Sequence, residues 1–130
     1  MLDANLCIRV LRDRPQSISE RFTAEASKLA ISTIVLYELQ HGAERSRRPV
    51  HQHELVNAFA AHLTVFDFDA KAALHSAQIK ADLEARGNII GPNDLLIAGH
   101  ARSLGLKLIT GNLGEFRRVN GLRCEDWLDG

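Results

Sequence analysis

The chain has 130 residues, of which 45% are hydrophobic, and this length suits one compact domain spanning residues 1–130. The 16 Lys and Arg residues equal the 16 Asp and Glu residues, so the chain lacks the strongly basic balance that is typical of many nucleic-acid-binding proteins. The sequence shows no secretory signal and no apolar run near the roughly 20 residues of a membrane span. Its two cysteines, Cys7 and Cys124, are isolated, which excludes a disulfide framework. These features predict a cytoplasmic protein without membrane contact.

The first half of the chain alternates short apolar runs with helical patterns. Met1-Leu2 is typical of the end of a short strand. The next predicted elements are helices over 5–11 and 17–26, a strand over 28–32, a helix from Ile34 to about Arg45 and a helix that begins at Pro49.

The second half continues the alternation. Its predicted elements are a strand over 63–68, a helix over 70–86, a helix over 93–103, a strand over 106–110, a short helix over 113–117 and a strand over 122–124. Strands that alternate with helices predict an α/β fold with a mostly parallel central sheet and helices on both faces. In such folds, ligands bind at the carboxyl ends of the strands.

Two acids stand at positions where a carboxylate is unusual. Asp3 directly follows the first predicted strand, although it could serve only to cap the next helix. Glu38 follows Val35 by three residues and precedes Gly42 by four, so it belongs to the stripe expected to face inward. A partly buried carboxylate is costly without a compensating partner, which could be an arginine in a salt bridge.

Further polar residues are expected at the same edge of the sheet. Asp94 lies in the first turn of the 93–103 helix and in phase with its inner face, although the helix dipole alone would favour an acid there. Thr110, Asn112 and Glu115 follow the clearest strand, where a plain turn and a short capped helix are the alternative. Converging carboxylates repel one another unless a proton or a cation intervenes. An oxygen-only cluster of Asp3, Glu38, Asp94 and Glu115 suits Mg²⁺ or Mn²⁺, as one ion or two, which can activate water against a phosphodiester.

These residues carry a resemblance to PIN-domain ribonucleases, and within them to the VapC toxins of bacterial toxin–antitoxin pairs. The resemblance runs across nearly the whole chain, and the order and spacing of its motifs are more specific than any one motif. The motifs are Asp3-Ala4-Asn5, residues 37–44 around Glu38, residues 91–98 around Asp94, residues 110–116 from Thr110 to Phe116, and the closing segment up to Trp127.

The resemblance implies a PIN-like fold and a Mg²⁺-dependent endoribonuclease, with Mn²⁺ as the other candidate cofactor. It implies that Asp3, Glu38 and Asp94 are catalytic, metal-binding acids. Asn112 stands where the family commonly has a further Asp, so either Glu115 or Asn112 would complete the site. Ala4 replaces the usual Thr or Ser, which removes an accessory hydroxyl. The predicted catalytic and metal-binding residues are therefore Asp3, Glu38, Asp94 and Glu115, and the predicted substrate-binding residues are Asn5, Thr110 and Asn112.

The resemblance also implies partners. They are a second copy of the chain in a homodimer, a VapB-like antitoxin that blocks the site, and a structured RNA substrate such as tRNA. Cleavage of this RNA would inhibit translation and leave a 5′-phosphate and a 3′-hydroxyl. Aromatic residues make up only 5% of the chain, which argues against an extended base-stacking platform and favours recognition of RNA shape. The arginines expected to neutralise phosphates are Arg9, Arg12, Arg14, Arg45, Arg47, Arg48, Arg86, Arg117 and Arg118.

Two other kinds of protein cluster acids around a cation. A receiver-type phosphoacceptor domain needs an Asp at a mid-chain strand end and a Lys at the end of a late strand. Asp67 lies within an alternating segment and Lys107 begins its strand, so both fit that role poorly. The other alternative is a catalytically impaired module that only binds metal or RNA, which Asn112 and Ala4 leave open.

Overall fold

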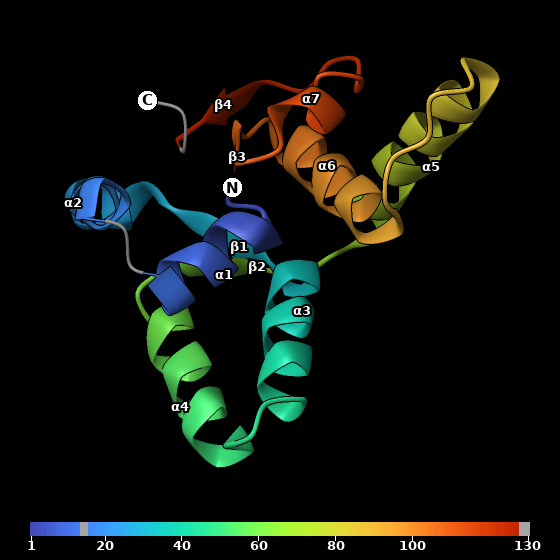
Figure 1. Cartoon of the computed structure of the whole chain (residues 1–130). Helices are drawn as coiled ribbons and strands as arrows, with labels where there is room; N and C mark the ends of the chain where they lie inside the picture. Colours follow the sequence, from blue (N-terminus) through green and yellow to red (C-terminus); the bar gives the residue numbers. More distant parts are fainter. Residues whose placement is uncertain (14–15, 128–130) are drawn as a thin grey trace.

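A small parallel sheet forms the centre of the molecule, and helices extend from it (Figure 1). The computed structural model describes residues 1–13 and 16–127. Strand β1 (Ala30–Ser32) pairs in parallel with β2 (Thr64–Phe66). Strand β3 (Leu108–Thr110) pairs in parallel with β4 (Cys124–Asp126).

Residues 1–3 join these two pairs into one sheet. The Leu2 N–H donates to the Ala30 carbonyl over 2.9 Å, and Leu2 forms a parallel bridge with Ile109. The Ile109 N–H donates to the Met1 carbonyl over 2.7 Å, and the Asp3 N–H donates to the Ile109 carbonyl over 3.0 Å. Residues 1–3 therefore lie between β1 and β3, as the predicted first strand requires. Asp3 emerges at the centre of the sheet.

The helices confirm the predicted alternation and with it the α/β fold. They are α1 (Ala4–Asp13), α2 (Gln16–Glu25), α3 (Thr33–Glu44), α4 (Pro49–Ala60), α5 (Ala70–Ala85), α6 (Pro92–Leu104) and α7 (Leu113–Phe116). Helices α3 and α4 form one antiparallel pair, and α5 and α6 form a second pair on the other side of the sheet (Figure 1). Contacts between α5 and α6 are more extensive than those between α3 and α4.

Three predictions about the strands and helices were wrong in detail. Ala26–Lys28 forms a 3₁₀ helix where the start of the 28–32 strand was predicted, and every strand is only three residues long. The last strand occupies Cys124–Asp126 instead of 122–124, because pairing with β3 sets its register. In α3 the inward stripe is Val35, Leu39 and Ala43, and Gly42 is exposed. Around the helix axis, Leu39 and Ala43 lie to one side of Val35 and Glu38 lies to the other, so Glu38 stands at the margin of the buried face.

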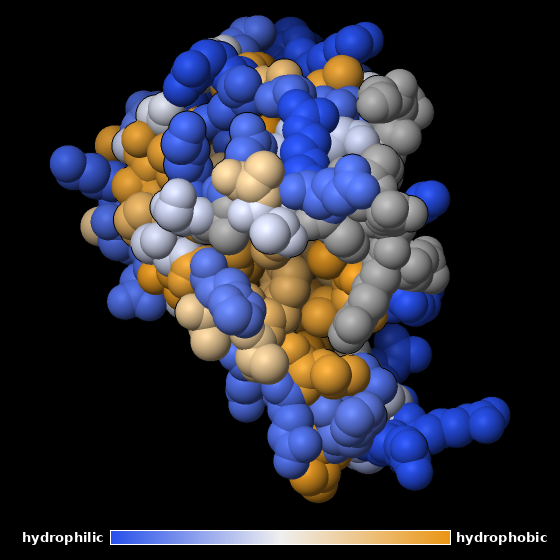
Figure 2. Space-filling view, turned by 90° about the vertical axis from the view of Figure 1, so that its left-hand side faces the viewer, coloured by the Kyte–Doolittle hydropathy of each residue, from blue (hydrophilic) through white to orange (hydrophobic). Residues whose placement is uncertain are grey.

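Apolar side chains meet around residues 1–3 and the two helix pairs. Leu2, Ile31, Val35, Ile97 and Leu108 are all fully buried. The face that carries α1, α2 and α4 has hydrophobic side chains in a hollow of about 320 Å³ (Figure 2). A larger hollow of about 530 Å³ lies between α5, α6 and residues 89–92. No helix in the described ranges is long and apolar enough to cross a membrane.

Side-chain caps fix where two of these helices begin. Ser32 Oγ accepts from the Ile34 N–H over 3.0 Å at the start of α3, and Asp69 Oδ1 accepts from the Ala72 N–H over 2.9 Å at the start of α5. We expect Asp69→Ala to lower the free energy of unfolding by about 1 kcal/mol, because the cap is lost. Urea denaturation would measure this. Asp67→Ala, which removes an exposed Asp just before the cap, is the matched control and should change little. An equal loss in both variants would contradict the capping role.

Candidate functional site

Asp3 lies at the carboxyl end of the central segment of the sheet and is 1% exposed. Its Oδ1 accepts from the Leu6 N–H over 2.9 Å, so it caps α1, and its Oδ2 accepts from the Thr110 hydroxyl. Burial raises the pKa of the Asp3 carboxyl, the two hydrogen bonds oppose this, and the negative charges of Asp126 and Glu115 raise it further. Asp3 therefore does cap α1, as the alternative expected, but its carboxyl is also acted on by the charges of Asp126 and Glu115.

The Asp94 carboxyl lies against Glu115, and its pKa is strongly raised. Burial is the largest cause that raises the pKa of Asp94 to about 7. The hydrogen bond between Asp94 and Glu115 raises it further, and so do the negative charges of Glu115, Asp3 and Glu38. A hydrogen bond between two carboxyl groups requires that one of them carries a proton. The proton in this hydrogen bond supplies positive charge between the two groups, and a cation at this position would replace it.

Glu115 is held in place by two other donors. The Gly91 N–H donates to its Oε1 over 2.8 Å, and the Asn112 amide donates to its Oε2 over 2.6 Å. The Asn112 N–H in turn donates to the Thr110 hydroxyl oxygen over 2.8 Å. Since the Thr110 hydroxyl donates to Asp3, a continuous chain of hydrogen bonds runs from Asp3 to Glu115.

Glu38 completes the group from α3. The carboxyl is half-buried and hydrogen-bonded to the Asn93 side chain at the start of α6. Burial raises its pKa, the Asn93 hydrogen bond lowers it, and the charge of Asp3 raises it. Among the described residues no arginine forms a salt bridge with Glu38, so the alternative of a buried ion pair is not found.

The structure therefore brings the four predicted acids to one edge of the sheet, from four separate stretches of sequence. Their roles in metal binding and catalysis stay predictions. Thr110 is buried and Asn112 is half-buried, and both position an acid. Asn5 is exposed in the first turn of α1, and its predicted contact with substrate stays a prediction. Arg14, one of the arginines predicted to meet RNA, lies outside the described residues.

Three residues of the site were not predicted from the sequence. Asp126 lies opposite Thr110 in the pairing of β3 with β4, and its charge acts on Asp3. Asn93 binds Glu38. A Cβ at Gly91 would lie 3.3 Å from Asp94 Oδ2 and 3.6 Å from Glu115 Oε1, so the absent side chain leaves room beside both acids. Correct placement of the last strand would have pointed to Asp126.

The donor set fits a hard divalent cation. Every candidate ligand is a carboxylate or an amide oxygen, which Mg²⁺ and Mn²⁺ prefer. In the described part of the chain, no three His, Cys, Asp or Glu side chains already stand in a common coordination geometry. Mg²⁺ commonly uses one or two carboxylates directly and retains several of its waters, so direct ligation by every acid is not required.

Comparison with known proteins decides the family. The PIN domain model matches residues 1–122. The chain belongs to the PIN domain family. This PIN domain is 46% identical over 127 residues to the tRNA(fMet)-specific endonuclease VapC of Shigella flexneri. The matched residues cover 98% of this chain and 96% of that protein. It is 44% identical over 128 residues to the ribonuclease VapC2 of Haemophilus influenzae, with 98% and 97% covered.

Solved structures give the same relationship. The PIN domain superposes on the DNA-bound VapBC structure from Salmonella typhimurium with a TM-score of 0.95 and 46% identity, covering 98% of this chain and 96% of that one. The VapBC2 structure from Rickettsia felis, bound to a promoter DNA fragment, gives a TM-score of 0.93 at 36% identity, with 98% and 97% covered. The predicted resemblance to VapC-type PIN domains is confirmed, and the receiver alternative is thereby excluded.

Proposed function

We propose that this chain is an endoribonuclease, the toxin of a VapBC-like toxin–antitoxin pair, and that it hydrolyses a phosphodiester bond with the help of Mg²⁺ or Mn²⁺. The observation that carries the proposal is the Asp94–Glu115 pair, where the pKa of Asp94 is raised to about 7 and the charges of Asp3 and Glu38 also act. The names and complexes of the relatives, ribonucleases and VapBC assemblies, support the same activity.

In this proposal Asp3, Glu38, Asp94 and Glu115 hold the cation. When bound, it supplies a Lewis acid that activates water and balances the charge on the phosphate. Thr110 keeps Asp3 oriented and Asn112 keeps Glu115 oriented, through the hydrogen bonds described above. The fourth carboxylate is therefore assigned to Glu115, with Asn112 as its positioning residue. Asn5 is exposed in the first turn of α1, the end of the helix that Asp3 caps, and is available to contact the RNA.

The substrate we propose first is initiator tRNA, because a relative that is 46% identical is named a tRNA(fMet)-specific endonuclease. An enzyme with this substrate works in the cytoplasm, which agrees with two free cysteines, Cys7 and Cys124. A VapB-like antitoxin and a second copy of this chain are the proposed protein partners. The two apolar hollows, over α1, α2 and α4 and beside α5 and α6, are surfaces of suitable chemistry for such contacts.

The test is cleavage of RNA with and without the cation. Purified chain would be incubated with initiator tRNA and with total bacterial RNA, in EDTA, in Mg²⁺ and in Mn²⁺. We expect discrete cleavage in Mg²⁺ or Mn²⁺, no cleavage in EDTA, and recovery when the cation is restored, because the acids alone repel the phosphate.

A matched pair of variants separates this activity from a contaminating nuclease. Asp3→Asn changes a predicted ligand, and Asp67→Asn changes an exposed Asp outside the site. Loss of cleavage in Asp3→Asn alone supports the site. Equal cleavage by the unmodified chain and both variants, or cleavage that persists in EDTA, would overturn the proposal.

A further inference from the structure

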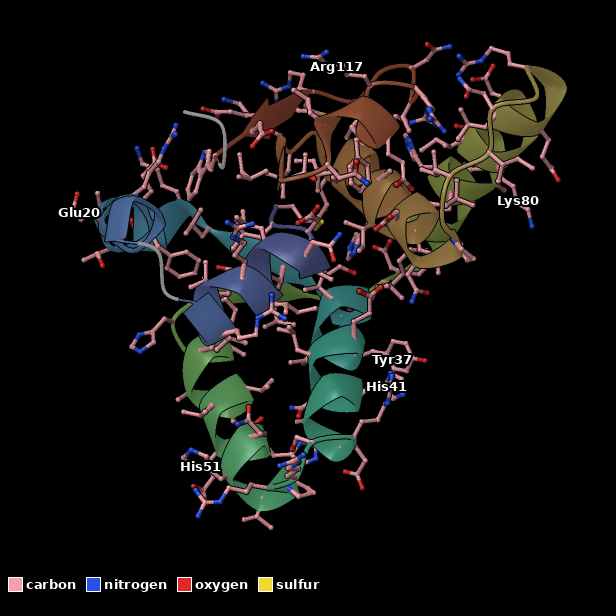
Figure 3. The ribbon with its side chains drawn as sticks, in the orientation of Figure 1. Glu20, Tyr37, His41, His51, Lys80 and Arg117 are labelled. Carbon is pink, nitrogen blue, oxygen red and sulfur yellow. The ribbon has the colours of Figure 1, made fainter. Side chains whose placement is uncertain are left out.

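We propose that Tyr37 and His41 form a stacking surface for one unpaired RNA base beside the acidic site, and that Arg45 continues this surface by binding the adjoining phosphate. The two rings project from the same side of α3, away from α4 (Figure 3). This inference rests on the proposed function, since it names the part of the RNA that the enzyme holds next to the bond it cuts.

The two rings form a flat exposed surface. Their centroids are 6.3 Å apart and their planes differ by only 7°. Tyr37 is 60% exposed, and His41 is also exposed. Among the described residues, no hydrogen bond or ion pair to either side chain accounts for this exposure. Tyr37 is also the only tyrosine in the chain. An exposed aromatic pair is a candidate for contact with a ligand.

The position of the pair ties it to the acids. Tyr37 is the neighbour of Glu38, and His41 lies one turn further along the same helix. At 3.6 residues per turn, Tyr37, Glu38, His41 and Arg45 fall within a sector of about 100° on α3. Glu38 occupies the edge of this sector that borders the buried stripe, and its carboxyl reaches Asn93 at the start of α6. A base stacked on the pair would therefore lie next to the acidic site.

Arg45 extends the surface away from the acids. It is exposed at the end of α3, and no acidic side chain of the described residues pairs with its guanidinium. Seven residues of helix separate it from Glu38, a rise of about 10 Å. Acid, ring and guanidinium thus succeed one another along one side of α3. This order matches cleavage site, base and phosphate along a single strand of RNA, since stacking is sequence-tolerant and guanidinium groups bind phosphate.

RNA suits this surface better than a protein segment does. An apolar protein segment needs a hydrophobic groove, and the two apolar hollows described above are lined by other residues. The surface formed by Tyr37, His41 and Arg45 is flat, aromatic and basic. It is also short, which agrees with the expectation that an aromatic content of 5% cannot support an extended platform.

The test compares ring-keeping and ring-removing variants in binding and in cleavage. Tyr37→Phe keeps the ring, Tyr37→Leu keeps the bulk, and Tyr37→Trp adds a fluorescent reporter. Leu74→Ala and His51→Ala truncate exposed side chains on α5 and α4 and are the controls. Affinity for initiator tRNA would be measured in EDTA, so that it is independent of cleavage, and single-turnover rates would be measured in Mg²⁺.

We expect Tyr37→Leu to weaken RNA binding by about five- to 150-fold, the worth of one stacked base, while Tyr37→Phe and both controls bind normally. RNA should quench the new fluorescence of Tyr37→Trp, which a purely structural role would not produce. Normal binding and cleavage by Tyr37→Leu would overturn the inference while the unmodified chain still cuts RNA. Failure of the unmodified chain to cut would instead overturn the proposed function.

Two further measurements test whether the surface instead contacts a protein. Sedimentation of the Tyr37→Leu variant should give the same mass as the unmodified chain, and a changed mass would show that the rings belong to contacts between copies. Inhibition by a VapB-like antitoxin should also be unchanged. Loss of inhibition with normal RNA binding would assign the rings to the antitoxin and overturn the inference.

Discussion

Asp94→Asn is expected to lower the rate of RNA cleavage by about 10³-fold and at the same time to stabilise the metal-free protein. The loss of activity follows because the amide no longer supplies the negative charge that holds a cation. The gain in stability follows because Asp94 is packed against Glu115 and acted on by the charges of Asp3 and Glu38, and this repulsion ends when the carboxylate is removed.

The pH dependence of this gain has a definite sign. The pKa of Asp94 is about 7 in the folded chain, above its ordinary value of 3.8, so the folded state binds the proton more tightly than the unfolded state does. This advantage is complete at low pH and is lost as the pH rises from about 4 to about 7. The amide that replaces this carboxyl cannot ionise. We therefore expect Asp94→Asn to be more stable than the unmodified chain by about 2 kcal/mol at about pH 8, and to gain little at about pH 4. The gain at pH 8 is smaller than the full pKa shift would give because solvent screens part of the repulsion.

Urea denaturation at these two pH values, with EDTA present, measures the stability, and cleavage of initiator tRNA in Mg²⁺ measures the activity. Asp67→Asn is the matched control, because it makes the same change at an exposed position outside the acid group. A variant that loses stability at high pH, or that retains normal cleavage, would show that Asp94 is not part of a repulsive, metal-binding set.

Gly99→Ala is expected to destabilise the fold by about 3 kcal/mol or more. Helices α5 and α6 pack closely at Gly99, where an added Cβ would overlap Ser76 Oγ and would lie 2.7 Å from the Ser76 backbone nitrogen and 2.8 Å from Ser76 Cα. Two of these atoms belong to the backbone, so a side-chain rotation cannot relieve the contact. The helices must separate, and α6 also carries Asp94 and Asn93.

Gly42→Ala is the matched comparison, because it makes the same change in another helix. Nothing lies within 4 Å of a Cβ added at Gly42, and the position is exposed. We expect a stabilisation of about 0.5–1 kcal/mol, since alanine loses less backbone entropy than glycine when a helix forms. Urea denaturation of both variants gives the two signs directly. A loss of similar size in both would mean that the close approach of α5 and α6 does not limit stability.

The positions of the acids could be predicted from the sequence because each depends on local patterning. Asp3 and Glu115 follow apolar strands, and Glu38 and Asp94 lie in phase, or nearly so, with buried helix faces. Such patterns are visible over windows of about ten residues. Their meeting follows from the general rule that strand ends of a parallel sheet share one edge.

What could not be predicted depends on contacts between distant segments. The register of β4 is set by its pairing with β3. Glu125 and Asp126 look unlike strand residues, so the sequence does not place Asp126 at the site. On the inner face of α3, Ala43 is buried where Gly42 was expected, and this depends on how that helix packs against its neighbours. The hydrogen bond between Asn112 and Glu115 assigns the two residues different tasks, which their types alone left undecided.

The most direct measurement is a titration with Mn²⁺ followed by electron paramagnetic resonance, on the unmodified chain and on Asp3→Asn, Glu38→Gln, Asp94→Asn and Asp67→Asn. If carboxyl groups contributed by separate segments jointly bind one kind of ion, the first three variants should bind Mn²⁺ at least about tenfold more weakly, and Asp67→Asn should bind it normally. Undiminished binding in all of the variants would contradict this account.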